Sequence, residues 1–463
     1  MHRLIVVGGG VTGLAGARAA VLAARGAGID LEVVVLEASD RLGGKLFTEV
    51  VDGVTIEWGP DAFLAAKSRG RGLAEELGLG GDLVPVAPGG RRAFVLRGGT
   101  LHQFPEGLVM GVPTSTRAAR RAVRAGLLSW GGAMRAAVEP LLPGRPIGDP
   151  DEPAATVVRR RLGRDAAVRL VEPILRGVFG VPGSEVGVRT ALPRAVGQRS
   201  LARALRPPAG AAADSDGSPF LALRGGFGSL VDTLAGTLPA GSIRTGSSVV
   251  SVSASGTDGF EVTRDGAEAL SADAVLLTAP AAATASALDP LAPLAAALFR
   301  EVRSSPSAVI VLRFPEGSLV RTLDGSGFLV DPDEGLATAA CSWYSSKWPH
   351  LAGGRLVLRA VVTDPGRLGA GDDELVHRVA GELGRVMGAQ AEPDLVRIHR
   401  WEQALPVFAP GHQDRMRQAV DALPERVAVA GAFLGAVGIP DCIESGETAA
   451  RSLVETLARA PRD

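Results

Sequence analysis

A run of closely spaced glycines near the N-terminus is the first feature that can support chemistry: Gly8-Gly9-Gly10-Val11-Thr12-Gly13. It follows the apolar residues 4–7, which predict a strand, and it opens an alanine-rich segment that predicts a helix over residues 12–24. Glycines permit a tight turn and let backbone N–H groups at a helix N-terminus approach a pyrophosphate. A second expected strand, residues 31–37, ends on Glu37, and an acidic residue at this place binds ribose hydroxyls. This context predicts a dinucleotide-binding site rather than a glycine turn without a ligand.

The residues after this strand indicate which dinucleotide is bound. They supply a second pair of glycines and two cations directly behind the ribose acid, in the run Glu37-Ala38-Ser39-Asp40-Arg41-Leu42-Gly43-Gly44-Lys45. This run resembles the signature of flavoproteins with two dinucleotide-binding domains, in which the loop closes over FAD. The resemblance implies FAD as the cofactor.

Three further segments narrow the family. They are Glu57-Trp58-Gly59-Pro60-Asp61-Ala62-Phe63-Leu64, the stretch from Trp401 to Pro406 followed by Gly411-His412, and the glycine-rich residues 432–443. Together they resemble the protoporphyrinogen and coproporphyrinogen oxidases, and the motifs occur in family order from about residue 4 to residue 457. Generic amine oxidases share the two glycine motifs but not the Gly-Pro-Asp and Gly-Ile-Pro-Asp-Cys-Ile segments.

The resemblance implies a set of site residues, carried over position by position. The expected FAD contacts are Gly8, Gly9, Gly10, Val11, Thr12, Gly13, Glu37, Ala38, Arg41, Gly43, Gly44, Lys45, Gly59, Pro60, Asp61, Ala62, Val249, Trp401, Val437, Gly438 and Ile439. Lys67 matches a family lysine whose ammonium pairs with a substrate propionate, and the alternative is a solvated lysine at a helix start. Val178 aligns with an apolar cavity residue, and the alternative is an ordinary core valine.

The family reaction is the oxidation of a porphyrinogen to a porphyrin by FAD and O2. This is a six-electron change, so a two-electron flavin cycles three times and three molecules of H2O2 form. The flavin carries the chemistry, and no catalytic side chain or metal is expected from the protein. In having a lysine at position 67, the chain resembles the Gram-positive branch of the family, which uses coproporphyrinogen III in haem biosynthesis. Protoporphyrinogen IX is the alternative substrate. The position of this reaction in haem biosynthesis predicts that the product passes to a ferrochelatase.

Composition excludes several classes of protein. The 463 residues carry 49 Lys and Arg against 50 Asp and Glu, and this near-neutral charge argues against a nucleic-acid binder. Cys341 and Cys442 are too few for a disulfide framework, and we expect both to be small buried residues. His412 is expected to be a hydrogen-bonded structural residue. Only three of the basic residues are lysines, which singles out Lys45, Lys67 and Lys347.

The order of predicted elements indicates an α/β fold (α+β overall). The expected architecture is a Rossmann-like FAD-binding domain assembled from residues 1–80, 219–290 and 425–463. Residues 81–105 and 291–424 are expected to form a substrate-binding domain with a mixed sheet, and residues 106–218 a helical subdomain. A flexible connection is predicted at residues 206–219, and a final helix at 445–458 after a short strand at 427–431.

Other functions and locations stay open at this point. An amine oxidase or carotenoid desaturase shares the fold, and so do lipid-binding regulators that carry no flavin. The N-terminus lacks the apolar region of a signal peptide, which predicts a cytoplasmic protein, with peripheral contact at the inner face of the membrane as a further expectation. Arg117, Arg120, Arg121 and Arg124 share one face of a predicted helix, which can meet anionic lipid, substrate carboxylates or only solvent.

Overall fold

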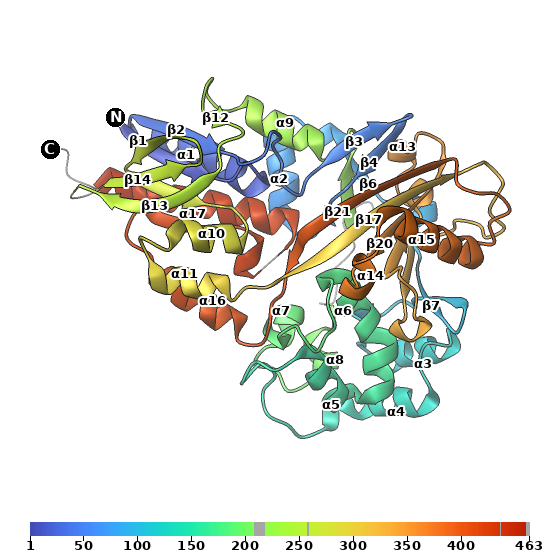
Figure 1. The fold of residues 1–463 in the computed structure, drawn as a ribbon. Helices are drawn as coiled ribbons and strands as arrows, with labels where there is room; N and C mark the ends of the chain where they lie inside the picture. Colours follow the sequence, from blue (N-terminus) through green and yellow to red (C-terminus); the bar gives the residue numbers. More distant parts are fainter. Residues whose placement is uncertain (208–217, 257–258, 436, 460–463) are drawn as a thin grey trace.

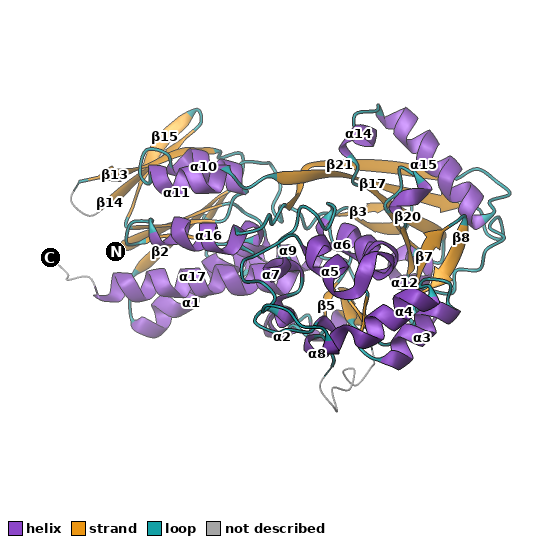
Figure 2. Cartoon of the chain, turned by 90° about the horizontal axis from the view of Figure 1, so that it is seen from below, coloured by secondary structure: helices purple, strands orange, loops and turns teal. Residues whose placement is uncertain are grey.

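The fold has two large sheets joined by long strands, with a layer of helices beneath them (Figures 1 and 2). The computed structural model describes residues 1–207, 218–256, 259–435 and 437–459. Most of the predicted connection at 206–219 therefore lies outside the described residues.

The first sheet is parallel and is built from distant parts of the chain. Its strand order is β12-β2-β1-β16-β22, and every neighbouring pair runs parallel. The strands are β1 (His2–Val7), β2 (Leu31–Leu36), β12 (Ile243–Arg244), β16 (Ala274–Leu277) and β22 (Val427–Val429). Runs such as Leu-Glu-Val-Val-Val-Leu in β2 are almost continuously apolar, as a parallel sheet covered on both faces requires. This is the Rossmann-like sheet that the sequence predicts.

Helices cover one face of the parallel sheet. They are α1 (Val11–Ala27), α9 (Gly228–Gly236) and α17 (Ile439–Arg459), whose apolar residues form one core with the strands. The backbones of α1 and α17 approach closely, because a Cβ on Gly16 would lie 3.0 Å from the carbonyl oxygen of Gly446. The two helix N-termini, which both carry predicted FAD contacts, are thereby held next to each other.

The opposite face is covered by α10 (Ala281–Leu288), α11 (Pro293–Arg300), α16 (His412–Asp421) and a small antiparallel sheet. That sheet consists of β13 (Val249–Ser255), β14 (Gly259–Arg264) and β15 (Ala267–Ala272). Helices α11 and α16 fall within the segment expected to bind substrate, yet they pack on the parallel sheet, since Phe299 of α11 stacks edge-on against Phe433 at 5.4 Å. The division of the chain into domains remains a proposal.

The second sheet is mixed, with the order β21-β17-β20-β19-β18-β7-β8. Only β18 and β7 pair in parallel. The strands are β7 (Ala93–Arg97), β8 (Thr100–Gln103), β17 (Ser304–Phe314), β18 (Gly327–Val330), β19 (Ala340–Ser342), β20 (Leu356–Val362) and β21 (Leu395–Pro406).

Alternation along β17 fixes the two faces of the mixed sheet. Ile310 and Leu312 point into a core covered by α15 (Asp372–Met387). Val309 and Val311 point to the other face, where the hairpin of β3 (Thr48–Val51) and β4 (Val54–Glu57) packs with α12 (Tyr344–Lys347) and α13 (Pro349–Ala352). The segment that leads to Gly59 is thus packed against the mixed sheet.

The helical layer has a hydrophobic core of its own. Its helices are α3 (Thr116–Arg124), α4 (Trp130–Val138), α5 (Ala154–Ala166), α6 (Glu172–Phe179), α7 (Val188–Ala191) and α8 (Leu201–Ala204). Ser115 and Ser129 cap α3 and α4 by accepting backbone hydrogen bonds. Asp151 accepts from the backbone N–H groups of Arg189 and Gly411, which ties the layer to the start of α16.

Short elements complete the structure. A three-stranded antiparallel sheet joins β5 (Phe63–Leu64), β11 (Phe220–Leu223) and β6 (Leu83–Pro85), and a further pair joins β9 (Leu108–Val109) and β10 (Val112–Pro113). The remaining helices are α2 (Ser68–Glu76) and α14 (Pro365–Leu368). Within the described ranges, no helix combines the length and the apolar character needed to cross a bilayer.

Candidate functional site

The first glycine turn has a conformation that side chains would block. Gly8 has a φ of 110°, and a Cβ there would lie 2.8 Å from the hydroxyl of Thr278. A Cβ on Gly13 would collide with the carbonyl oxygen of Gly8, so the turn closes only when position 13 is glycine. Residues 11 to 13 begin α1, which aims the N-terminus of that helix at the turn.

Glu37 follows the end of β2 and lies against this turn. Its carboxylate accepts the N–H of Gly9 at 2.7 Å and the N–H and hydroxyl of Ser39 at 2.9 and 2.8 Å. The neighbouring Ala38 is exposed. The carbonyl of Glu37 accepts the N–H of Ser247 at 2.8 Å, two residues before Val249. The structure therefore brings the predicted ribose acid and the predicted adenine-side valine to one edge of the parallel sheet.

The second glycine turn closes over the first one. Gly43 donates its N–H to the carbonyl of Gly9 at 2.9 Å, and Gly43 and Gly44 both have positive φ. The guanidinium of Arg41 donates to the Gly44 carbonyl at 2.8 Å. A Cβ built on Gly10 would meet no atom closer than 3.9 Å, so space remains between the two turns. This backbone cradle fits the pyrophosphate of a dinucleotide such as FAD.

A third predicted segment, Gly59 to Ala62, lies beside Lys45. A Cβ on Gly59 would collide with the Lys45 carbonyl, so glycine permits the contact between the two chain segments. The Lys45 side chain is largely buried, and burial lowers the pKa of its ammonium. Pro60 is exposed and Ala62 is half-buried, so this segment presents a surface between the two glycine-bearing loops.

Buried charges from the mixed sheet and from α12, which packs on it, hold the same segment. Lys347 donates to both carboxylate oxygens of Asp61, at 3.0 and 2.9 Å, and the indole N–H of Trp348 donates to Asp61 at 3.1 Å. The guanidinium of Arg359 donates to the carbonyls of Glu57 and Gly59 at 2.9 and 2.5 Å. Burial alone would raise the pKa of Asp61, but the charges of Lys347 and Arg359 and the hydrogen bonds outweigh it, so this pKa lies below its ordinary value.

The pKa of Glu57 is shifted in the opposite direction to that of Asp61. Its side chain is buried and accepts the N–H of Phe227 at 2.6 Å and the hydroxyl of Thr48 at 3.0 Å. Burial nevertheless raises the pKa of Glu57 to about 8, because Arg359 and these hydrogen bonds only partly offset the lost hydration. Glu57 is therefore mostly protonated at neutral pH and holds the start of α9 against β3 and β4.

Trp401 lies on β21 within an aromatic cluster. Its indole N–H donates to the carbonyl of Trp58 at 2.9 Å, and its ring lies 4.4 Å from that of His399. The Arg41 guanidinium lies 4.3 Å from the ring of Phe47 and 5.9 Å from that of Trp401. The structure thus brings predicted contacts from residues 41 and 401 together, and it adds His399 and Phe47, which the sequence analysis missed.

The N-terminus of α17 carries the last group of predicted contacts. Ile439 begins the helix, and Val437 and Gly438 precede it, while residue 436 lies outside the described residues. Lys67 forms an ion pair with Asp441 in the first turn. The second oxygen of that carboxylate is buried without a partner among the described residues, and it faces Gly438. An orphaned acceptor at the helix N-terminus beside the predicted flavin contacts fits a bound group that carries an N–H donor.

Val178 belongs to α6 in the helical layer. Its side chain is 41% exposed, so the alternative of an ordinary core valine is wrong. Two residues later, Gly180 lies against the side chains of Ser305 and Leu405, on the strands β17 and β21. Since Trp401 is on β21, the end of α6 meets the strand that carries a predicted flavin contact.

The expectations for histidine and cysteine are confirmed. His412 is buried, and its Nε2 donates to the carbonyl of Phe433 at 2.8 Å. Burial lowers the pKa of His412, which keeps the ring neutral. Cys341 and Cys442 are buried free thiols, and burial raises the pKa of Cys442 to about 11.

The sequence singled out Lys347 only by the rarity of lysine and assigned no role to Arg359, yet both cations hold the Gly59 segment. Lys347 and Arg359 come from the mixed sheet and its covering helix, far along the chain from Asp61. The one available signal was the rarity of lysine, since Lys45, Lys67 and Lys347 all lie at the candidate site.

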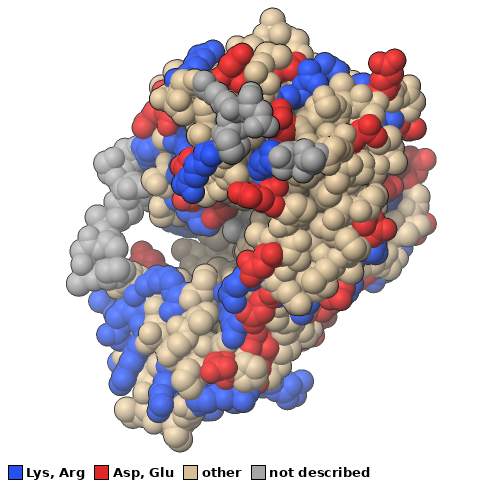
Figure 3. All heavy atoms as spheres, turned by 90° about the vertical axis from the view of Figure 1, so that its left-hand side faces the viewer, with Lys and Arg blue, Asp and Glu red and all other residues tan. Residues whose placement is uncertain are grey.

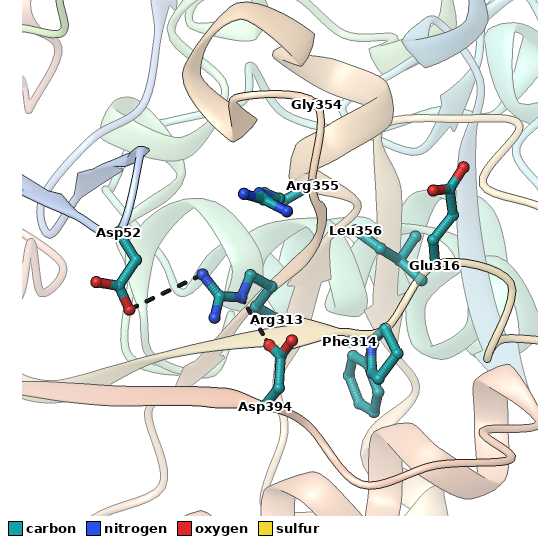
Figure 4. A pocket seen from close by; sticks show the side chains of 9 residues that line it. Asp52, Arg313, Phe314, Glu316, Gly354, Arg355, Leu356 and Asp394 are labelled. Atoms are coloured by element: carbon teal, nitrogen blue, oxygen red, sulfur yellow. Dashed lines mark hydrogen bonds and ion pairs between the residues drawn. The ribbon is translucent and has the colours of Figure 1, made fainter.

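A separate cavity of about 470 Å³ lies at the far end of β17 (Figure 4). Within it, the guanidinium of Arg313 forms ion pairs with Asp394 at 2.6 Å and with Asp52 at 3.9 Å. Arg355, in the turn before β20, also lines the cavity. It is formed around Phe314, whereas Trp401 pairs with Ser307 near the start of the strand. This cavity is therefore not part of the glycine-rich site.

A parallel sheet with two glycine turns, the predicted ribose acid Glu37 and a helix N-terminus is typical of a flavin-dependent oxidoreductase. The chain belongs to the family of flavin containing amine oxidoreductases, whose sequence profile matches residues 11–454. Its cofactor is FAD.

Relatives and solved structures agree with this assignment. The chain is 33% identical to the coproporphyrinogen III oxidase of Bacillus subtilis (strain 168), over 96% of each chain. It is 27% identical to protoporphyrinogen oxidase 1 of Spinacia oleracea chloroplasts, over 98% of this chain and 84% of that one. A crystal structure is known for a protein of Exiguobacterium sp. 255-15 that carries the provisional name of protoporphyrinogen oxidase. Its sequence is 31% identical to this chain, and the two structures match with a TM-score of 0.82 over 99% of this chain and 98% of that one. Cyclohexylamine oxidase from Brevibacterium oxydans IH-35A has the same fold, with a TM-score of 0.72 and 18% identity over 99% of this chain and 100% of that one.

Proposed function

We propose that this chain oxidises coproporphyrinogen III to coproporphyrin III with FAD and O2. Each porphyrinogen gives up six electrons in three two-electron steps, and three O2 become three H2O2. The observation that carries the proposal is similarity over nearly the whole chain to coproporphyrinogen III oxidases, at 33% identity in Bacillus subtilis and 29% in Staphylococcus aureus.

Lys67 supports a carboxylate-bearing substrate. Its side chain is about half exposed, and the ion pair with Asp441 occupies only one of its three N–H donors. The remaining donors can bind a propionate close to the N-terminus of α17, where the predicted flavin contacts Val437 to Ile439 lie. A cation in this place favours a substrate with several carboxylates.

The residues of this chain bind and orient the reactants. The two glycine turns and Glu37 are proposed to hold the pyrophosphate and ribose of FAD, and Val249 the adenine side. The segments around Gly59, Trp401 and Ile439 are proposed to border the ring system, and Val178 the apolar body of the substrate. FAD supplies the hydride acceptor, and O2 regenerates it. The N-terminus of α17 would direct positive backbone dipoles toward the ring system and would stabilise the negative charge of its reduced form.

Two other activities are weighed against this proposal. Oxidation of protoporphyrinogen IX is the second candidate, because the spinach relative carries that name. Amine oxidation through a tyrosine cage is disfavoured, since the single tyrosine, Tyr344, is buried and donates its hydroxyl to the carbonyl of Thr55.

The proposed location follows from the proposed reaction. We place the enzyme in the cytoplasm, where its product passes to a ferrochelatase in a transient contact. Peripheral contact with the inner face of the membrane is proposed as well.

The reaction is tested by the stoichiometry of turnover in air. The purified, FAD-loaded protein is mixed with coproporphyrinogen III, and porphyrin fluorescence is followed together with H2O2. Three H2O2 for each porphyrin support the proposal. The proposal would be refuted if the flavin-loaded protein oxidised coproporphyrinogen III no faster than buffer alone.

A further inference from the structure

Helix α2 lies directly against the first turn of α17. Gly70 of α2 is buried, and a Cβ there would lie 2.9 Å from Cγ of Pro440 and 3.0 Å from the ring of Phe63. A side chain at this position would force the two helices apart. Lys67, the proposed partner of a substrate carboxylate, immediately precedes α2, and its ion-pair partner Asp441 belongs to the same first turn of α17. The position of α2 on α17 therefore sets where the Lys67 backbone lies.

Arg69 joins the two helices through a buried carboxylate. Its guanidinium donates to both oxygens of Glu447 of α17, from Nε at 2.6 Å and from Nη2 at 2.5 Å. The Glu447 side chain is only 2% exposed, and a buried carboxylate needs a close cation to offset its lost hydration. Glu447 also accepts from Arg451 of the same helix, at 3.2 Å. Arg69 thus supplies the hydrogen bonds that tie α2 to α17.

The same arginine reaches a second carboxylate at the end of α2. Glu76 accepts from Nη1 of Arg69 at 2.6 Å and from Arg18 of α1 at 2.8 Å. The hydrogen bond from Arg69, together with that from Arg18, lowers the pKa of Glu76 to about 2, so this carboxylate stays charged near neutral pH. Helices α1, α2 and α17 are therefore joined by one set of charged groups. This set, here called the Arg69 cluster, consists of Arg18, Arg69, Glu76, Glu447 and Arg451.

Burial distinguishes the bond between Arg69 and Glu447 from ion pairs on the surface. Figure 3 shows basic side chains beside acidic ones at several places on the upper lobe. Exposed pairs such as Arg300 with Asp289 stabilise a protein little, because water and salt screen them. The pair formed by Lys67 is also half exposed on the lysine side, and the ammonium sits on a flexible stem. That pair alone does not fix where the ammonium lies, so the position of Lys67 depends on how firmly α2 is held.

We propose that Arg69 is a positioning residue for the substrate. Through Glu447 it holds the start of α2 against the N-terminus of α17, and it thereby places the Lys67 ammonium where a substrate carboxylate can bind beside the predicted flavin contacts. Arg69 acts through Lys67, since both of its own carboxylate partners belong to the protein. This role rests on the proposed function, because Lys67 is the proposed partner of a substrate carboxylate.

Double-variant kinetics with coproporphyrinogen III test whether Arg69 acts through Lys67. In Arg69→Gln, KM of the FAD-loaded protein should rise about fivefold with little change in kcat, because the ammonium is displaced and the chemical step is not. In a Lys67→Met background the same substitution should change KM by less than about twofold, because the group that Arg69 positions is already absent. A purely structural role of Arg69 would raise KM by the same factor in both backgrounds.

Binding of the product gives a readout that does not depend on turnover. The dissociation constant of coproporphyrin III, measured by the anisotropy of its fluorescence, should rise about fivefold in Arg69→Gln and stay nearly constant when Arg69→Gln is added to Lys67→Met. Arg69→Lys keeps the charge but replaces the planar fork by one ammonium, so it should restore part of the affinity. The same cycle is run with Arg69→Lys if Arg69→Gln does not fold.

Arg97→Gln is the matched control for loss of a buried ion pair. Arg97 of β7 pairs with Asp331, and the exposed fractions of these side chains, 23% and 0%, are close to the 23% and 2% of the pair in the Arg69 cluster. Both Arg97→Gln and Arg69→Gln should lower the urea midpoint of unfolding, but only Arg69→Gln should raise KM. The absorbance of bound FAD in each sample separates loss of the cofactor from loss of substrate binding.

Three results would overturn the proposal. They are an unchanged KM in Arg69→Gln, equal factors with and without Lys67, or an equal rise of KM in Arg97→Gln. In each of these cases the wild type still oxidises coproporphyrinogen III, so the proposed function stands. If the proposed function fails, the wild type itself neither binds coproporphyrin III nor oxidises coproporphyrinogen III, and the role of Arg69 is refuted with it.

Discussion

Replacement of Lys347 by methionine tests whether buried charges hold the Gly59 segment. The ammonium makes two hydrogen bonds to Asp61, and the side chains of the pair are only 14% and 13% exposed. Removal of one partner from a buried pair costs about 3–5 kcal/mol, because the other charge stays buried. Trp348 and Arg359 still stabilise the carboxylate, so we expect about 3 kcal/mol. This loss destabilises the conformation that binds FAD, so we expect the dissociation constant of FAD to rise about a hundredfold.

The assay is a fluorescence titration of flavin-free protein with FAD, accompanied by the urea midpoint of unfolding. The double variant Lys347→Met, Asp61→Asn removes both charges and should recover most of the loss, with a coupling free energy of about 2 kcal/mol. Arg397→Met, an exposed cation on β21, is the matched control. The reasoning is refuted if Lys347→Met binds FAD as the wild type does and the coupling lies below about 0.5 kcal/mol.

Further outcomes follow from the same contacts. The folded protein keeps a proton on Glu57 up to about pH 8, whereas the unfolded chain loses it near pH 4.5, so the free energy of unfolding should fall as pH rises between these values. Urea unfolding at pH 5.5 and 8.5 should show a smaller fall in Glu57→Gln, and an equal fall would contradict the assignment. Lys67→Met should raise KM for coproporphyrinogen III about five- to tenfold with little change in kcat, and an unchanged KM would leave Lys67 only as the partner of Asp441. The thiols of Cys341 and Cys442 should react with a disulfide reagent at pH 7.5 only after unfolding, since both are buried and un-ionised; rapid labelling of the folded protein would contradict this.

Local sequence was sufficient for the glycine turns and for the first two strands of the parallel sheet. Positive φ at Gly8 and Gly43 and the apolar runs of β1 and β2 are determined by residues close together in the chain. The start of the last helix was predicted wrongly, at Ser445 instead of Ile439. A proline in the first turn does not interrupt a helix, because the N–H it lacks would have no partner there, so α17 includes Pro440.

Pairing between distant residues could not be predicted from the sequence. Asp61 and Lys347 are 286 residues apart, and Lys67 and Asp441 are 374 residues apart. No periodicity or spacing connects such positions, because the two sheets that bring them together are assembled from separate parts of the chain. The sequence left Lys67 either as a partner of a substrate propionate or as a solvated lysine, whereas the structure gives it a carboxylate partner within the protein.

The proposed function is tested most directly by kcat/KM of the FAD-loaded protein for coproporphyrinogen III and for protoporphyrinogen IX. Both reactions are followed in air by porphyrin fluorescence under the same conditions. We expect at least a tenfold preference for coproporphyrinogen III, since two additional carboxylates offer partners to Lys67. An equal or higher value for protoporphyrinogen IX would contradict the proposed substrate.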